Sequence, residues 1–282
     1  MALSVLNNIS SLVAQNQLGI TQANLQNTLT QLSSGSRINT GADDAAGLAI
    51  ANGLQANVTG LTQSVANANS GVGALQVADG ALGQVTTLLN RAVTLATEAS
   101  TGTVSTTQRT ALDAEYQQIL QQIDSIGSNT TFNGTTIFAS NTTTTTSIFL
   151  SDSSTAGTTT IGVNVSGLST TALALHGTSL TGTPGSTGAT DPEATLALIN
   201  VSIATVASDR GTIGAGINRL QAASNVANNE IQNLTSAQDQ ITAANIPTVV
   251  ANLSKYSILE RTGISALAQA NTAQQQVLNL LQ

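Results

Sequence analysis

Apolar residues recur every three and four positions along two long stretches of this chain, and this spacing limits what it can fold into. The stretches span residues 54–75 and 196–241, and Arg210, Ser224 and Gln238 interrupt the second. The apolar positions are Leu54, Val58, Leu61, Val65, Ala68, Val72 and Leu75, then Leu196, Ile199, Ile203, Val206, Ile213, Ile217, Leu220, Ala227, Ile231, Leu234 and Ile241. Such a stripe lies along one face of an α-helix and is buried against another helix. We therefore predict a mainly α chain, an antiparallel coiled-coil hairpin rod with its termini together.

The segment between the two stripes predicts the β-structure. Residues 128–192 are rich in Thr, Ser and Gly, and residues 147–150 and 158–165 alternate as strands do. We expect a small central β-hairpin here, followed by a polar loop over residues 177–192.

The rest of the chain predicts helices and three regions. The expected helices span residues 3–32, 44–100, 107–126, 192–244 and 247–281. The expected regions are terminal helices from 1–43 and 242–282, a helical bundle from 44–140 and 192–241, and a variable surface hairpin and loop over 141–191. Asp43 and Asp44 precede the second helix, where carboxylates can cap free backbone N–H groups.

Composition excludes several classes of function. Charged residues make up 7% of the chain, the formal net charge is −7, and there are seven Lys and Arg together. So few cations make nucleic-acid binding by phosphate neutralisation improbable. The chain has no cysteine, which excludes disulfides and thiolate zinc sites. We expect no cofactor and no enzymatic activity.

The N-terminal residues predict neither a signal peptide nor a membrane anchor. They contain no basic segment followed by an apolar run. No stretch approaches the ~18 apolar residues of a membrane span. By these signals the chain is cytoplasmic, unless it is exported by a route that needs no cleaved signal.

The two terminal helices are predicted to be incomplete without partner molecules. They are too short and too amphipathic to be stable alone in water, and uncovered apolar surface implies a partner. The packing candidates are Leu3, Leu6, Ile9, Val13, Leu25, Leu29 and Leu32 near the N-terminus, and Leu253, Ile264, Leu267, Leu278 and Leu281 near the C-terminus.

Three sequence motifs resemble those of one known family. Residues 32–50 read LSSGSRINTGADDAAGLAI, residues 132–135 read FNGT, and the C-terminal part contains LAQAN at 267–271 and QVLNLL at 276–281. These motifs occur in the same order in bacterial flagellins, over about 220 residues of this chain. The chain therefore resembles a near-minimal flagellin, because only residues 177–192 separate the hairpin from the returning helix.

The resemblance implies a role in assembly. Flagellins leave the cell through the flagellar type III export channel without a cleaved signal, and they polymerise beneath a cap into an extracellular filament. The implied partners are other copies of the chain, an export chaperone and the filament cap. The terminal helices would form the inner core tube, with Arg37, Asp43 and Asp44 as further subunit-packing candidates.

The chain departs from the family pattern at two places. An acidic pattern common before the last helix is replaced by Ala243, Asn245, Pro247 and Val249, and we predict that Pro247 opens that helix at its first position. The surface that Toll-like innate receptors recognise in this family corresponds to Asn90, Arg91, Leu95 and Glu115. Asn90 and Val93 differ from the family residues, so we expect weaker receptor activation.

Other interpretations of the sequence remain open. A hook–filament junction protein has similar ends, and a secreted adhesin or immune-receptor ligand is conceivable as a secondary role. His176, the only histidine, is interpreted as a solvated loop residue. The pair Asp43 and Asp44 is interpreted as a helix cap and subunit contact rather than a metal site.

Overall fold

The computed structural model describes all residues except 1–7, 139–141, 143, 152–159, 187 and 281–282. The chain divides into two compact units. Residues 1–56 and 233–282 form one, called here the terminal unit, and residues 57–232 form the other, called the central unit.

Five helices make up most of the described chain. They are α1 (Ile9–Ser34), α2 (Ala45–Ala99), α3 (Thr106–Asn129), α4 (Pro192–Thr242) and α5 (Ile246–Leu280). The first helix begins at Ile9, after the capping residue Asn8, and not at residue 3 as predicted; residues 1–7 lie outside the described ones. The bounds of the other helices differ from the predicted ones by at most three residues, at the end of α3, which continues to Asn129. The prediction of a mainly α fold with a small central β-hairpin is confirmed.

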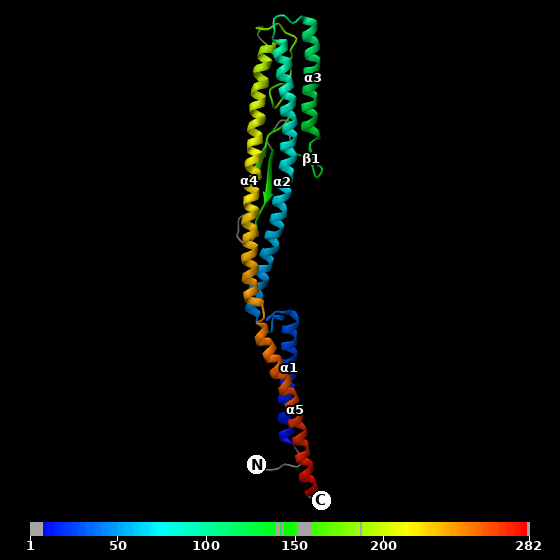
Figure 1. Cartoon of the computed structure of the whole chain (residues 1–282), viewed down its shortest axis with the longest axis vertical. Coiled ribbons are helices and arrows are strands. Elements are labelled where there is room, and N and C mark those ends of the chain that lie inside the picture. Colours follow the sequence, from blue (N-terminus) through cyan, green and yellow to red (C-terminus); the bar gives the residue numbers. More distant parts are fainter. Residues whose placement is uncertain (1–7, 139–141, 143, 152–159, 187, 281–282) are drawn as a thin grey trace. The chain divides into compact units, whose positions relative to one another are not determined.

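In the terminal unit, α1 packs along α5 (Figure 1). The less exposed positions of α1 include Ala14, Leu18, Thr21, Leu25, Thr28 and Leu32, which recur every three or four residues. Gly263 of α5 lies against this face, because a Cβ there would come within 3.3 Å of Leu18 Cδ1. The Thr21 and Thr28 hydroxyls donate to Gln17 O at 2.8 Å and Asn24 O at 2.7 Å, so both threonines can be buried without an unpaired donor.

The loop after α1 holds the end of α4. Gly35 ends α1 with a φ of 69°, in the left-handed region that glycine adopts readily. The Arg37 N donates to Thr242 O at 2.6 Å, and Arg37 Nη2 donates to Ile241 O at 2.8 Å. Ala244 N donates to Gly35 O at 2.9 Å. The two bonds from Arg37 satisfy carbonyl groups of the last turn of α4 that no helical N–H can reach, and the bond from Ala244 joins the chain after α4 to the end of α1.

The break between α4 and α5 occurs close to the predicted proline. Asn245 caps α5, because its Oδ1 accepts from Thr248 N at 3.2 Å and its O accepts from Val249 N at 3.0 Å. Pro247 is therefore the second residue of α5, one position later than predicted. The first turn of a helix has no intrahelical partner for its N–H groups, so the missing proline N–H has no cost there.

In the central unit, α2, α3 and α4 share one hydrophobic core. The heptad stripes supply buried residues from both long helices: Leu61, Ala68 and Leu75 of α2, and Ile199, Val206, Ile213, Leu220 and Ala227 of α4. The stripe of α2 continues beyond Leu75 through Leu82, Val85 and Leu89 to Ala99, which the sequence analysis did not identify. At one interruption of the α4 stripe, Arg210 Nε binds Asp79 Oδ1 of α2 at 2.8 Å.

Two antiparallel β-hairpins lie in the central unit. Strand β1 (Thr131–Phe132) pairs with β2 (Thr135–Thr136), and β3 (Thr144–Phe149) pairs with β4 (Thr160–Val165). Figure 1 shows the longer hairpin along α2 and α4. Its side chains fill space left by helix glycines: a Cβ at Gly71 would clash with Ile148, and a Cβ at Gly216 would come within 2.8 Å of Val163.

The chain from β4 to α4 contributes to the core. This returning segment, residues 166–191 apart from 187, buries Leu168, Leu173, Leu175 and Leu180. The predicted polar loop over 177–192 thus contains buried side chains, including Thr178 and Leu180. His176 is exposed within this segment, as expected.

Candidate assembly surface

The terminal unit exposes many large apolar side chains. On α1, Ile9, Leu12 and Val13 are each more than 60% exposed. Further exposed residues of this unit are Ile20, Leu29, Ile50, Ile246, Val250, Ile258, Leu259 and Ile264. We call these eleven residues the assembly surface. Exposed large apolar side chains in such number are typical of interaction sites.

The predicted packing residues divide between two faces. Ile9, Val13, Leu29 and Ile264 belong to the assembly surface. Leu25, Leu32, Leu253 and Leu267 are half-buried, on the faces where α1 and α5 pack together. Leu3, Leu6 and Leu281 lie outside the described residues, as does the side chain of Leu278.

Sequence reasoning missed part of the assembly surface. Seven of its eleven residues were not selected as packing residues: Leu12, Ile20, Ile50, Ile246, Val250, Ile258 and Leu259. The signal was present in α1, where apolar residues occur on every side and Ile9–Ser34 contains no charged residue. A charge-free helix can approach identical helices without like-charge repulsion.

Three polar candidates make bonds within the terminal unit. Arg37 binds the end of α4, as described above. Asp44 Oδ1 accepts from Gly47 N at 2.9 Å, which is the capping role predicted for it. Asp43 Oδ2 instead accepts from Asn39 N at 3.0 Å and Thr40 N at 2.8 Å in the preceding turn. These bonds, with that from Thr40 first, hold the pKa of Asp43 below its ordinary value.

The receptor-surface candidates lie on α2 and α3 of the central unit. Arg91 Nε donates to Glu115 Oε1 at 2.7 Å, and both side chains are about half exposed. This bond lowers the pKa of Glu115 and raises that of Arg91. Asn90 is exposed, whereas Leu95 is only 1% exposed. Leu95 therefore supports this surface from beneath, contrary to its selection as a surface residue.

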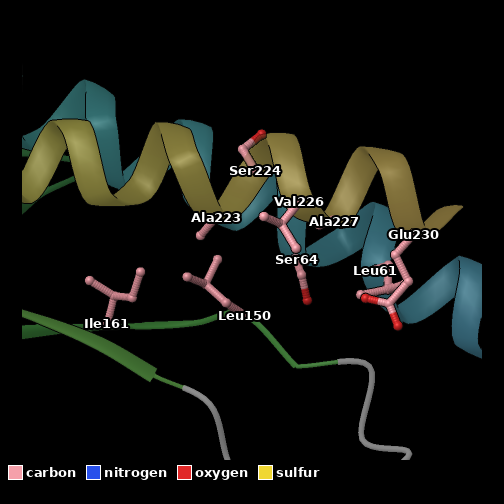
Figure 2. Close-up of a pocket in the computed structure, with 9 residues that line it drawn as sticks. All are labelled: Leu61, Ser64, Leu150, Ile161, Ala223, Ser224, Val226, Ala227 and Glu230. Atoms are coloured by element: carbon pink, nitrogen blue, oxygen red, sulfur yellow. The ribbon is translucent and has the colours of Figure 1, made fainter.

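A shallow cavity of about 230 Å³ lies between α2, α4 and the longer hairpin. Figure 2 shows Leu61, Leu150 and Ile161 around it, with Val226 and Glu230 contributed by α4. Among the described residues, Glu230 is the single ionisable one of its lining. One exposed carboxylate among aliphatic side chains provides no pair of acid and base for catalysis.

The described ranges contain neither a cluster of metal-ligating side chains nor a helix able to cross a membrane. No group of three or more His, Asp or Glu side chains there could hold a metal ion. None of the helices in those ranges combines the length and apolar character that crossing a bilayer requires.

Both the N-terminal and the C-terminal part of the chain match regions of one protein family. Residues 5–143 match the bacterial flagellin N-terminal helical region, and residues 196–281 match the bacterial flagellin C-terminal helical region. Together these matches include α1, α2, α3, most of α4 and α5.

Individual relatives agree over nearly the whole chain. The flagellar filament 33 kDa core protein of Treponema phagedenis is 31% identical over 97% of this chain and 98% of its own length. The flagellin of Listeria innocua is 33% identical over the same shares of both chains. The crystal structure of Bacillus cereus flagellin is 30% identical, with a TM-score of 0.44, and covers 57% of this chain and 88% of that one. The chain belongs to the bacterial flagellin family.

Proposed function

We propose that this chain is a structural subunit of the bacterial flagellar filament and that the assembly surface forms its subunit contacts. The observation that carries the second part is the exposure of large apolar side chains on α1 and α5. Burying these side chains between subunits stabilises the assembled state by roughly 25 cal/mol for each Å² of apolar surface removed from water. Contacts of this kind need not close into a ring, and heterologous contacts that do not close generate a helical filament.

A pair of valines tests the assembly surface. Val13 of α1 and Val201 of α4 are 63% and 59% exposed, but only Val13 lies on the assembly surface. We expect Val13→Gln to slow or abolish seeded polymerisation and Val201→Gln to leave it close to wild type. Sedimentation and electron microscopy of purified protein with filament seeds measure the outcome.

The same assay separates the competing interpretations. Normal assembly of Val13→Gln would contradict the proposed surface without affecting family membership. A wild-type chain that forms no long filaments with seeds would favour the hook–filament junction alternative.

The proposed function includes export and two helper proteins. We infer that the chain reaches the cell exterior through the flagellar export channel without a cleaved signal, escorted by an export chaperone and assembled beneath a cap. The exposed apolar side chains of α1 and α5 support the proposal of a chaperone, because such helices would otherwise associate before export. Co-purification of the chain with a chaperone from the cytoplasm, and loss of the complex in Val13→Gln, would test this contact.

Recognition by Toll-like receptors is proposed to be weak. The guanidinium of Arg91 is engaged by Glu115, and Val93 provides no second positive charge beside it. A missing charged hydrogen bond at an interface costs about 1–3 kcal/mol. We expect the double variant Asn90→Gln/Val93→Arg to raise the response of receptor reporter cells. A wild-type response that already equals that of a flagellin with the full motif would contradict this.

A further inference from the structure

The turn between β1 and β2 places an Asn–Gly pair in contact with solvent. Asn133 and Gly134 form a two-residue turn with φ values of 50° and 76°, and both residues are exposed. No hydrogen bond to the Asn133 carboxamide is present among the described residues. The two strands that the turn joins are only two residues long, Thr131–Phe132 and Thr135–Thr136, so few bonds restrain it.

The order Asn then Gly permits a reaction within the chain. The backbone nitrogen of Gly134 can attack the side-chain carbonyl carbon of Asn133, forming a C–N bond and expelling ammonia. Water then opens the resulting succinimide at one of its two carbonyls, giving aspartate or isoaspartate. The sum is one amide plus one water giving one carboxylate and one ammonium ion, with no oxidant or reductant. Gly134 lacks a Cβ, and no neighbouring atom lies within 4 Å of the place where one would stand, so no side chain of this residue or of its surroundings crowds the attacking nitrogen.

A second Asn–Gly pair in the same chain provides an internal comparison. Asn52 and Gly53 are also exposed, and Gly53 has no heavy atom near its missing Cβ. They lie inside α2, however, where the Gly53 N–H belongs to the regular helical hydrogen-bond pattern. Attack by this nitrogen requires that the helix open locally and that the backbone rotate, which costs free energy.

We propose that Asn133 is a spontaneous deamidation site of this protein. The aspartate product keeps the turn, because Asp tolerates positive φ as Asn does, and it adds one negative charge per subunit. The isoaspartate product lengthens the main chain by one methylene between Phe132 and Thr135. That change breaks the pairing of these two residues and shifts the Phe132 ring, which lies about 3.6 Å from the position of a Cβ on Gly73.

Incubation of the purified full-length chain at mildly alkaline pH tests the proposal. Peptide mass spectrometry follows conversion of each Asn–Gly amide to the acid, and an isoaspartate-specific methyltransferase detects the second product. We expect Asn133 to react at least about tenfold faster than Asn52, the factor that a local opening free energy of about 1.4 kcal/mol produces. The Asn133→Gln variant should remove the main isoaspartate signal.

The same incubation in concentrated urea separates structure from local sequence. Without the helix, the two Asn–Gly pairs should react at similar rates. Equal rates in the native chain, or a native Asn133 that stays unmodified while the urea-unfolded one reacts, would overturn the proposal. The second result would mean that the turn protects the amide.

Discussion

At the scale of single residues, Ser and Thr hydroxyl groups supply most of the buried polar side chains of the described residues, with Arg109 and Asp191 as the charged ones. Ser202 of α4 is fully buried, and its Oγ donates to Leu173 O at 2.8 Å in the returning segment. Thr195 Oγ1 donates to Ser179 O at 3.1 Å in the same way. A hydroxyl that is hydrogen-bonded can be buried at a small cost, whereas an unpaired charge cannot. In this chain, of which only 7% is charged, hydroxyl hydrogen bonds thus help to fix the position of the returning segment on α4.

Tyr116 is the large polar side chain of this core. Its hydroxyl lies 2.6 Å from Thr178 Oγ1, which in turn donates to Leu175 O at 2.7 Å. Because the Thr178 proton is already used, Tyr116 is the donor in the first bond. Burial raises the pKa of Tyr116 to about 12 from the ordinary value of 10.0.

This shift predicts a loss of stability at alkaline pH. Below pH 10 the folded and unfolded chains both keep the Tyr116 proton, and its contribution to stability is complete. Between pH 10 and about 12 the unfolded chain loses the proton first, so the free energy of unfolding falls. Denaturant titrations over this pH range should show the decrease. The Tyr116→Phe variant should lose about 1 kcal/mol at neutral pH but show a weaker decrease above pH 10. An unchanged alkaline decrease would exclude Tyr116 as its source.

At the scale of elements, the returning segment is fastened to α3 and α4 by side chains from both helices. Asp124 of α3 accepts from Thr170 N at 2.7 Å, and Asp113 accepts from Leu180 N at 2.8 Å. The close approach depends on a glycine near the end of α3. A Cβ on Gly127 would overlap the backbone oxygen of Leu168. The segment therefore behaves as part of the helical bundle rather than as a free loop.

Two glycine substitutions test how much stability depends on the close contact between α3 and the returning segment. Gly127→Ala should destabilise the protein by roughly 1–3 kcal/mol, because backbone atoms must move apart. Gly80→Ala on α2, where nothing lies within 4 Å, should stabilise it by up to about 1 kcal/mol through helix propensity alone. Chemical denaturation of both purified variants gives the two values. A Gly127→Ala protein as stable as the wild type would show that the segment can shift without loss.

At the scale of the whole molecule, the two units differ in how completely they bury their apolar residues. The central unit has a continuous core that extends over α2, α3, α4 and the longer hairpin. Among its described residues, the terminal unit buries few apolar side chains, such as Ile38, Ala51 and Val249. A region with few buried apolar contacts opens at a lower free energy than a region with a dense core.

Limited trypsin digestion of the monomer should reveal this difference. Lys255 and Arg261 lie on α5 of the terminal unit, whereas Arg91 and Arg219 lie on exposed positions of the central unit. We expect first cleavage at Lys255 and Arg261, and protection of both in assembled filaments if neighbouring subunits cover α5 as proposed. Mass spectrometry identifies the cut sites. First cleavage at Arg91 or Arg219 would contradict the expected order of stability.

The sequence predicted the central unit better than the terminal one. In α4, most large apolar residues occupy one stripe, with Val201 and Val226 as exposed exceptions, so the positions of Ile199, Val206 and Ile213 in the core followed from spacing alone. In α1, apolar residues occur all round the helix. Spacing alone therefore grouped Ile9 and Val13, which are exposed, with Leu25 and Leu32, which face α5.

By itself, the sequence determined the helices, their approximate ends, the short β-hairpin and the family, because these depend on local periodicity, turn residues and motifs. Only the tertiary structure decided which face of α1 packs on α5 and which remains exposed. It also decided that Leu168, Leu173, Leu175 and Leu180 belong to the core. The physical reason is the same in both cases: burial of these side chains depends on contacts with elements distant in the sequence, and no local pattern records such contacts.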